Sequence, residues 1–418
     1  MNARERFMEV MNFNPSVHSV KWEFGYWGDT LNNWYAQGLP KKNFAEIPNV
    51  VTTPSTSMYT VVWHCKNRYR EAKGTQAYPA GIGITGGGIP WPQQSFPLDS
   101  DVKEACNLDQ SQIKVDLNLG FYPILEPEIF EEDDVLMRYK DVDGVVRLFH
   151  KETGVLPMPV EWPVKAQDDW EKIKHERLRL DDIRERLPRR WSELVEEYKQ
   201  RDYPLLMGCY PYGFFGTLVH LMGYEQAFYS YYDHPALVDD ILETFTDLWI
   251  AVYSEVLAEV EVDFVHIWED ISSGKGSMVS PAIMRRFMVP YYKKLTSFLK
   301  SSGVDIIIVD TDGDCSDIIP VFLEGGVTGL YPFEVDCGID LVQVRKDFPK
   351  LQMLGGVPKG QLSQGKGSID RILKPVEAVL KTGGYIPYVD HLVPPEVPWE
   401  EFKYYREKLN RLIDARGH

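Results

Sequence analysis

Short apolar runs alternate with longer segments of helical periodicity over the second half of the chain. Many of these runs are nearly continuous, such as the IIIV of 306–309, which is typical of parallel strands buried on both faces. Six such βα units in one half of the chain favour a (β/α)8 TIM barrel, with an open doubly wound sheet as the alternative. We predict strands at 204–210, 263–268, 304–309, 327–332, 351–355 and 385–389, and helices at 235–260, 281–301 and 367–381.

The first half of the chain is less regular. We expect the two remaining barrel strands at 19–24 and 114–125. The prediction is therefore an α/β protein with a single barrel domain over 1–418. It has an N-terminal extension and a loop and helical insertion around 50–200.

Three stretches of the first half indicate local structure. Gly, Pro and Ser are dense over 74–99, which indicates a long surface loop or lid. Asp143 and Gly144 separate two β-rich runs within 134–149, which predicts a hairpin. The charged stretch 164–200 predicts solvated helices.

Composition narrows the function classes. The net charge of -17 disfavours nucleic-acid binding and attraction to anionic lipid. Five cysteines without a C-x-x-C pair argue against a disulfide framework and a zinc ribbon, and indicate a reducing compartment. The charged amino terminus and the lack of a long apolar stretch predict a cytoplasmic protein outside the membrane. An aromatic content of 13% indicates a pocket or interface rich in rings, although core packing is the commoner use.

Two patterns resemble phosphate-binding loops, and both fail on context. Residues 81–86 fit G-x-G-x-x-G, but GGIPWP follows, which cannot open the helix that would hold a pyrophosphate. Residues 360–366 fit G-x-x-x-x-G-K, but Gly367 stands where the Mg²⁺-binding Ser or Thr belongs. Neither dinucleotide binding nor nucleotide hydrolysis is predicted.

Acidic residues follow several of the predicted strands. In a parallel barrel the carboxyl ends of all strands point to one mouth, where active sites lie. Any one of these residues alone could be a helix N-cap or a loop carboxylate. Together they would raise one another's pKa, which suits acid–base chemistry or a divalent metal. The residues are Glu269, Asp270, Asp310, Asp312, Glu334 and Asp390, joined by His391.

His391 is the strongest single candidate because it follows a strand and precedes a rigid Pro394-Pro395 exit. It could serve as a base oriented by a carboxylate or as a metal ligand, and the alternative is a surface histidine before a turn. His266 lies inside a strand and is expected to be a satisfied core residue. His64 and Cys65 lack a matching second pair of ligands.

Several segments together resemble the uroporphyrinogen decarboxylase-like superfamily, and more narrowly its anaerobe-type members grouped with cobalamin-dependent methyltransferases. The resemblance covers nearly the whole chain apart from 50–105. The segments are NARERFMEVMNF at the start, GCYPYGFFGTLVHLMG at 208–223, WEDI at 268–271, VDTDG at 309–313, GLYPFEVDCGIDL at 329–341 and GGYIPYVDHLVPPEV at 383–397.

The resemblance implies a (β/α)8 barrel with one of two chemistries. True uroporphyrinogen decarboxylases open with an arginine-bearing segment that neutralises substrate carboxylates, whereas here 22–27 reads WEFGYW. We therefore expect no porphyrinogen decarboxylation. The methyltransferase branch typically binds zinc through His-x-Cys and a later Cys. Asp310 to Asp312 and Asp390-His391 stand at those places, which implies an oxygen-rich site for zinc or another divalent metal.

The resulting hypothesis is a methyltransferase that demethylates a small methoxylated, aromatic compound and passes the methyl group to a corrinoid. Nothing in the chain resembles a corrinoid-binding domain, so the corrinoid would be carried by a separate protein. A homodimer is one expectation for its assembly. The alternatives are a metal-free decarboxylase of a small acid and a non-catalytic protein that binds an aromatic ligand. The predicted catalytic residues are Glu269, Asp270, Asp312 and His391, the predicted metal ligands are Asp310, Asp312, Glu334 and His391, and the predicted ring-binding residues are Tyr26, Trp27, Phe215 and Tyr388.

Overall fold

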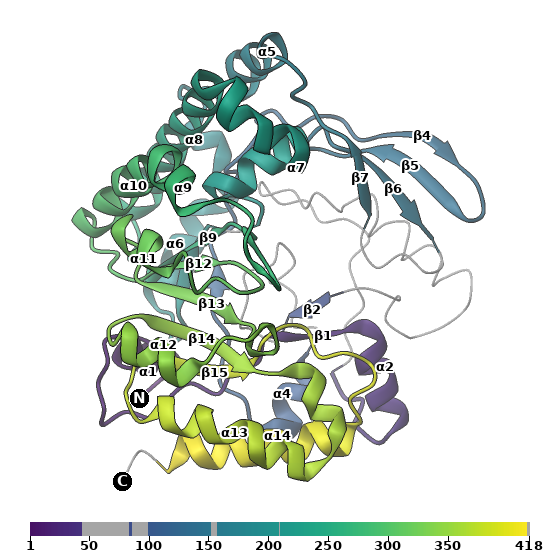
Figure 1. Cartoon of the computed structure of the whole chain (residues 1–418), viewed down its shortest axis with the longest axis vertical. Coiled ribbons are helices and arrows are strands. Elements are labelled where there is room, and N and C mark those ends of the chain that lie inside the picture. The colour runs from purple at the N-terminus through teal and green to yellow at the C-terminus, as the bar shows by residue number, and fades with distance from the viewer. Residues whose placement is uncertain (44–82, 86–98, 152–156, 209, 416–418) are drawn as a thin grey trace.

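The structure is a computed structural model that describes residues 1–43, 83–85, 99–151, 157–208 and 210–415. Its centre is a curled parallel sheet covered by helices (Figure 1). Within the described residues the sheet has seven strands in the order β15-β14-β13-β12-β9-β8-β3. The strands are β3 (Ile113–Lys114), β8 (Leu205–Met207), β9 (Phe264–Trp268), β12 (Ile307–Asp310), β13 (Gly329–Phe333), β14 (Gln352–Val357) and β15 (Tyr385–Val389).

The six strands expected in the second half of the chain are confirmed, and their burial explains their sequence. Every residue of β13, β14 and β15 is buried, so each face needs apolar side chains. The expected strand at 114–125 is much shorter than predicted. It reduces to the two residues of β3, which pair with Leu205 and Leu206 of β8.

Residues 19–24 lie between the two ends of the parallel sheet without forming a ladder with either. On one side the Ser19 hydroxyl donates to the carbonyl of Tyr385 in β15. On the other side the Trp22 indole donates to the carbonyl of Gln110, just before β3. The α/β architecture is therefore confirmed, whereas a closed barrel of eight paired strands stays a prediction.

A buried ion pair also fixes this segment. The Glu23 carboxylate lies 3.1 Å from the guanidinium of Arg406, and both side chains are buried. Arg406 belongs to the last helix, α14 (Trp399–Asp414). The start and the end of the chain therefore meet against the same part of the sheet.

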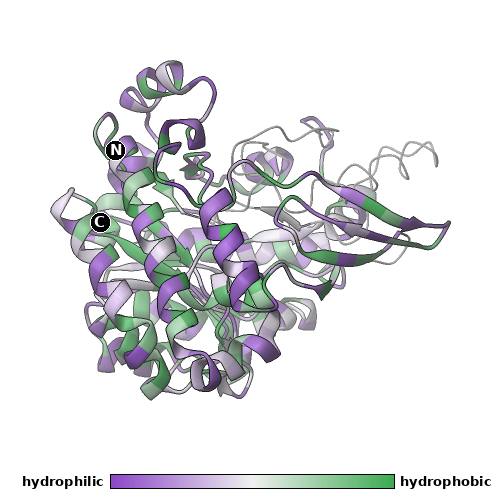
Figure 2. Ribbon diagram, turned by 90° about the horizontal axis from the view of Figure 1, so that it is seen from above, coloured by the Kyte–Doolittle hydropathy of each residue, from purple (hydrophilic) through white to green (hydrophobic). Residues whose placement is uncertain are grey.

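Helices cover the outside of the sheet, and in Figure 2 they are banded with hydrophilic and hydrophobic residues. The predicted helices at 235–260 and 367–381 are confirmed as α8 and α13. The predicted helix at 281–301 is two helices, because Pro290 opens the second one. The helices are α1 (Ala3–Met11), α2 (Gly28–Ala36), α4 (Ser100–Cys106), α5 (Gln167–Arg177), α6 (Trp191–Lys199), α7 (Phe214–Asp233), α8 (Pro235–Leu257), α9 (Pro281–Phe287), α10 (Val289–Ser301), α11 (Ile319–Glu324), α12 (Leu341–Asp347) and α13 (Lys366–Leu380), with 3₁₀ turns η1 (Ile183–Arg186), η2 (Val335–Cys337) and η3 (Lys359–Gln364).

A four-stranded antiparallel sheet extends away from the barrel (Figure 1). The hairpin predicted within 134–149 is confirmed as its two central strands, and Gly144 takes the positive φ of the turn between them. The sequence did not indicate the two outer strands. The strands are β4 (Glu128–Glu132), β5 (Leu136–Lys140), β6 (Val146–His150) and β7 (Met158–Glu161).

Two short antiparallel strand pairs complete the described strands. Strand β1 (Gly25–Trp27) pairs with β2 (Gly83–Thr85), and β10 (Ser272–Ser273) pairs with β11 (Gly276–Ser277). The rest of the expected loop at 74–99, except Asp99, lies outside the described residues, as do His64 and Cys65.

Candidate functional site

The carboxyl ends of neighbouring strands bring several predicted residues together. Asp310, the last residue of β12, lies in register with Trp268 of β9 and Tyr331 of β13. The residues just past these strands, Asp270 and Asp312, therefore lie side by side. We call this place the mouth, defined by Asp270, Asp310, Asp312, Glu334, Lys359, Asp390 and His391.

Asp312 and His391 face each other at the mouth. The Nε2 atom of His391 lies 3.6 Å from Oδ2 of Asp312. Burial and the neighbouring carboxyls of Asp310, Asp270 and Glu334 raise the pKa of Asp312 well above its usual value. The His391 ring packs 4.9 Å from the ring of Phe24, and burial, aided by the nearby Lys359 cation, lowers its pKa to about 4. The raised pKa of Asp312 favours its protonated form, and the lowered pKa of His391 favours a neutral imidazole.

Lys359 is a charged residue of the mouth that was not predicted from the sequence. Its ammonium lies 3.1 Å from Oε1 of Glu334 and 3.5 Å from Oδ1 of Asp390. Burial lowers the pKa of Lys359, but the two carboxylates outweigh it, so the pKa is raised. The signal was present, because Lys359 follows a predicted strand just as the acidic residues do.

Asp390 is fully buried behind this lysine. Its Oδ1 accepts the backbone N–H of Lys359 at 3.0 Å, while its Oδ2 has no partner among the described residues. Burial raises the pKa of Asp390 to about 7, although the Lys359 cation opposes this shift. Asp390 therefore holds Lys359 in place through its backbone N–H and its ammonium. Its pKa lies near neutral pH.

His266 lies deeper, where it supports Asp310. Its Nε2 atom is 3.2 Å from Oδ2 of Asp310 and 2.7 Å from the hydroxyl of Tyr331. The residue is buried in the core, as predicted. It is not fully satisfied, because its Nδ1 atom has no partner in the part of the chain that the structure describes. Asp310 is thus tied to the interior of the barrel.

Asp270 occupies a strained position at the mouth. Its φ of 45° is unusual for a residue other than glycine, and such outliers gather at functional sites. Burial raises its pKa to about 6, and the carboxyls of Asp310 and Glu334 add to the shift. Asp270 is therefore a second acid with a pKa close to neutrality.

Glu269, expected among the catalytic residues, points away from the mouth. Its carboxylate is fully buried and accepts the backbone N–H groups of Phe214 at 2.8 Å, Phe215 at 2.6 Å and Gly216 at 3.2 Å. The Tyr292 hydroxyl donates to the same carboxylate. Glu269 therefore satisfies the first amides of α7, which gives it a structural contact in this arrangement.

The four predicted ring-binding residues do not form one clamp. Tyr26 is fully buried and packs against Trp34 at 5.3 Å in the core. Phe215 and Tyr388 are also fully buried, and only Trp27 of the four is partly exposed. Aromatic residue type alone could not separate core packing from ligand contact.

The predicted metal ligands are engaged in other contacts. Glu334 accepts the N–H of Gly313 at 2.7 Å and binds the ammonium of Lys359, and Asp310 contacts His266. Among the described residues, no group of three or more His, Cys, Asp or Glu side chains could hold a metal ion. The donor set in this arrangement does not fit a metal, and zinc binding stays a prediction.

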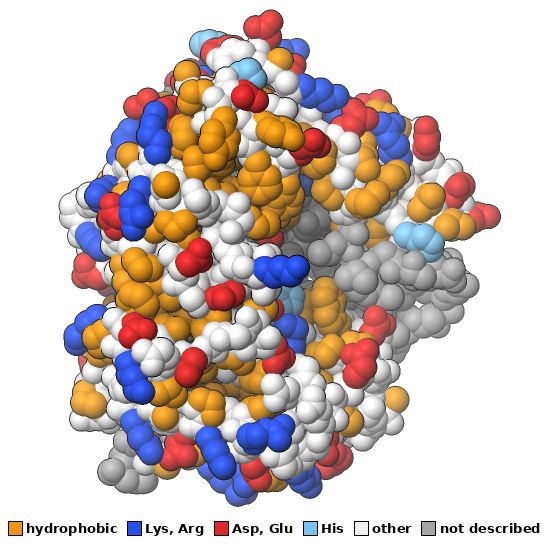
Figure 3. Space-filling view, in the orientation of Figure 1, with side chains coloured by type: hydrophobic (Ala, Val, Ile, Leu, Met, Phe, Trp, Pro, Cys, Tyr) orange, Lys and Arg blue, Asp and Glu red, His pale blue; other side chains and the backbone are white. Residues whose placement is uncertain are grey.

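Charged side chains of both signs are mixed on the surface. On the face drawn in Figure 3, Lys and Arg side chains are interspersed with Asp and Glu. Within the described residues, no helix is long and apolar enough to cross a membrane.

A parallel sheet covered by helices, with titratable groups at the carboxyl ends of its strands, is the arrangement typical of α/β enzymes. A family model for uroporphyrinogen decarboxylase (URO-D) matches residues 152–412. The chain belongs to this family, which confirms the family resemblance seen in the sequence.

Comparison with solved structures gives weaker likenesses. A methyltransferase from Methanosarcina mazei is similar at 15% identity and a TM-score of 0.47, over 92% of this chain and 99% of that one. A putative vitamin-B12-independent methionine synthase from Listeria monocytogenes is similar at 10% identity and a TM-score of 0.31, over 53% of this chain and 69% of that one. No curated protein matches the chain.

Proposed function

We propose that this protein is a methyltransferase that demethylates a small methoxylated compound with an aromatic body and passes the methyl group to the corrinoid of a separate protein. The reaction class follows the branch of the family that the sequence motifs resemble. One feature supports it most directly: several carboxyl groups gather at the mouth, and burial together with these neighbours raises the pKa of Asp312 well above its usual value.

The charge at the mouth supports a neutral substrate. The carboxyl groups of Asp270, Asp310 and Asp312 gather there, and Lys359, the cation among them, is already paired with two further carboxylates. A substrate with several carboxylates would be repelled, whereas an uncharged ether would not be. This argument disfavours a porphyrinogen as the substrate.

Asp312 would act as the general acid. Breaking the C–O bond of an ether leaves an alkoxide or phenolate, which departs poorly unless it is protonated. In the proposed step Asp312 donates its proton to the ether oxygen as the bond between that oxygen and the methyl carbon breaks. The products are an alcohol or phenol and a methylated acceptor. The corrinoid supplies the nucleophile that takes the methyl group.

His391 would keep Asp312 in its acidic form. Because the pKa of His391 is lowered to about 4, the ring is neutral near pH 7 and offers no cation that would stabilise the Asp312 carboxylate. At 3.6 Å from Asp312 Oδ2, the ring is also placed to pass a proton from solvent back to Asp312 after each turnover.

The test is an assay of methyl transfer by the full-length protein. Free cob(I)alamin serves as a surrogate acceptor with a panel of methoxybenzenes, and the visible spectrum reports methylcobalamin. We expect Asp312→Asn to lower kcat by about 100-fold or more, because general acids contribute about that much. Asp317→Asn changes an exposed carboxylate on the same loop and is expected to leave kcat unchanged.

Other outcomes identify the alternatives. Release of CO₂ from a small carboxylic acid, without methylcobalamin, would establish a decarboxylase. Binding of an aromatic ligand without either product, unchanged by Asp312→Asn and His391→Ala, would establish a non-catalytic binding protein.

A further inference from the structure

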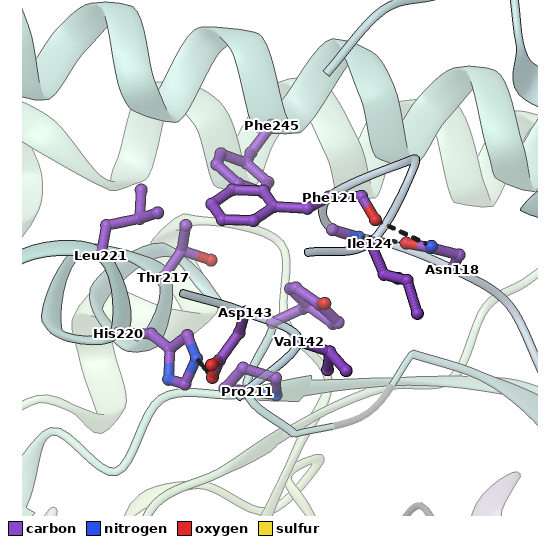
Figure 4. A pocket seen from close by; sticks show the side chains of 12 residues that line it. Asn118, Phe121, Ile124, Val142, Asp143, Pro211, Thr217, His220, Leu221 and Phe245 are labelled. Atoms are coloured by element: carbon purple, nitrogen blue, oxygen red, sulfur yellow. Dashed lines mark hydrogen bonds and ion pairs between the residues drawn. The ribbon is translucent and has the colours of Figure 1, made fainter. Parts of the chain in front are cut away.

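A cavity lies beside α7, between the parallel sheet with its helices and the antiparallel sheet (Figure 4). Its walls come from four parts of the chain: the loop after β3, the hairpin turn between β5 and β6, the start of α7, and α8. Most of the walls are apolar. The lining side chains that matter here are Phe121, Val142, Asp143, Thr217, His220 and Phe245.

Contacts between these parts hold the cavity in shape. Helix α7 is interrupted at Gly223, which has a φ of 79°. An added Cβ on Gly223 would lie 2.8 Å from the ring of Trp162, so only glycine lets this ring approach so closely. The N–H of Val164 donates to the carbonyl of Leu221 at 3.0 Å. The wall formed by α7 is therefore fixed before any ligand arrives.

Most polar groups of the walls already have partners. Asp143 accepts two hydrogen bonds from Arg147, at 2.9 and 2.6 Å, and its Oδ2 lies 2.5 Å from Nε2 of His220. The Asn118 side chain bonds to the backbone of Gly120 and Phe121, each at 3.0 Å. These side chains shape the cavity without needing a ligand.

Thr217 is the exception. Its side chain is 2% exposed, and its hydroxyl has no partner among the described residues. In Figure 4 this hydroxyl points toward the space between the lining side chains. A buried hydroxyl without a hydrogen bond is costly, so its presence points to a partner that binds there.

The charge of the walls is balanced. The guanidinium of Arg147 and the ring of His220 hold the pKa of Asp143 well below its usual value despite burial, so this carboxylate is charged and compensated. Burial and the nearby Asp143 raise the pKa of Asp141 well above its usual value, although Arg147 opposes this shift. The carboxylate of Asp143, which lines the cavity, is already paired with Arg147 and His220.

The chemistry of the cavity walls indicates the kind of ligand. A buried water usually makes two to four hydrogen bonds. Here a water would find one free hydroxyl and mostly apolar walls. A molecule with one oxygen and an apolar body matches these walls better, because it satisfies Thr217 and leaves no polar atom of its own unpaired.

We propose that this cavity is a binding site for a short, uncharged alcohol or ether, whose oxygen hydrogen-bonds to Thr217 and whose carbon atoms contact Phe121, Val142 and Phe245. The site does not depend on the proposed methyl-transfer reaction. The ring of Tyr210 connects the cavity to the end of β9, because it lies 6.5 Å from the ring of His220 and 4.4 Å from that of Trp268.

The test is a titration of the full-length protein with ethanol, followed by NMR of its labelled Ile, Leu, Val and Thr methyl groups. We expect saturable shifts at the methyl groups of Val142 and Leu221. Thr217→Val keeps the shape of the side chain and removes the hydroxyl, so it should weaken ethanol binding about tenfold. Thr296→Val removes a buried hydroxyl of α10 that already has a partner and serves as the matched control, with unchanged affinity expected.

Three outcomes would overturn the proposal: no saturable shift at these methyl groups, equal affinity in the Thr217→Val variant, or equally tight binding of ethylammonium, which carries a charge. Thermal unfolding keeps the test valid. Loss of an unpaired buried hydroxyl should leave the Tm of Thr217→Val at or above that of the wild type, so weaker binding cannot be attributed to misfolding.

Discussion

Glu269→Ala is expected to destabilise the protein strongly, because the Glu269 carboxylate accepts four hydrogen bonds in a fully buried place. Three come from the first backbone amides of α7 and one from the Tyr292 hydroxyl. A buried donor left without a partner costs about 1–3 kcal/mol, and a lost helix cap costs about 1 kcal/mol. Partial rehydration of the space left by the side chain would offset some of this cost. We expect a loss of about 4 kcal/mol in the free energy of unfolding.

The size of this loss should depend on pH. Burial raises the pKa of Glu269 from 4.5 to about 7. A carboxyl whose pKa is higher in the folded state than in the unfolded state stabilises the fold less as the pH rises. The loss begins at the pKa of the unfolded state and is complete above the pKa of the folded state. Between those values the wild type should lose up to about 3 kcal/mol, whereas the alanine variant has no such group to titrate. The difference between the two proteins should be largest near pH 5 and smaller at pH 8.

Urea unfolding at both pH values measures the global effect, and hydrogen exchange of the peptide 211–222 measures the local one. The amides of Phe214 and Phe215 should exchange faster in the variant. Tyr292→Phe removes one of the four donors and should cost about 1 kcal/mol. A Glu269→Ala protein that is as stable as the wild type, yet inactive, would refute this reasoning and return Glu269 to the catalytic residues.

The other predictions concern the mouth and the chain ends. Asp270→Asn should raise stability at pH 8 by about 1–2 kcal/mol and have little effect at pH 4, because the raised pKa of Asp270 costs stability as pH rises from about 4 through about 6; equal effects at both pH values would contradict it. Lys359→Met should give zinc binding that calorimetry does not detect in the wild type, because it frees two carboxylates; no binding in the variant would mean that Lys359 is not what blocks a metal. The same variant should raise the pKa of His391 above about 4 in an NMR titration, since the lost cation lowers it, and a constant pKa would count against that contact. Arg406→Met should cost about 3–5 kcal/mol in urea unfolding because Glu23 stays buried without its partner, and a loss below about 1 kcal/mol would show that the pair is dispensable.

Much of the barrel could be predicted from the sequence because its strands are buried on both faces. Such strands read as apolar runs whatever their neighbours are, and the predicted and observed bounds of β15 agree. The length of the strand predicted at 114–125 was too great. This stretch is rich in apolar residues, but its pairing with β8 ends at Lys114. The outer strands of the antiparallel sheet were missed. All five residues of β4 are exposed, so its sequence carries no burial pattern.

The site could be predicted only in part, because position after a strand does not fix the direction of a side chain. Glu269 and Asp270 are adjacent, yet one enters the interior at the start of α7 and the other reaches the mouth. The two side chains point in different directions where the backbone of Asp270 has a positive φ. A positive φ in a residue other than glycine cannot be predicted from a sequence pattern. Lys359 was not predicted because a lysine after a strand is as typical of a solvated surface as of a site. The contacts of Asp312 with His391 and of Lys359 with Glu334 depend on three-dimensional packing.

Residues 19–24 affect the tendency of the parallel sheet to associate with other molecules in solution. A parallel sheet with two open sides presents unpaired backbone groups that recruit strands from other molecules. Here one short segment covers both open sides at once, through Ser19 on β15 and Trp22 beside β3. Its hold depends on side chains and on the partnership of Glu23 with Arg406 rather than on a ladder. Displacing residues 19–24 would expose both edges of the sheet at once. This segment therefore limits self-association in addition to its place in the fold.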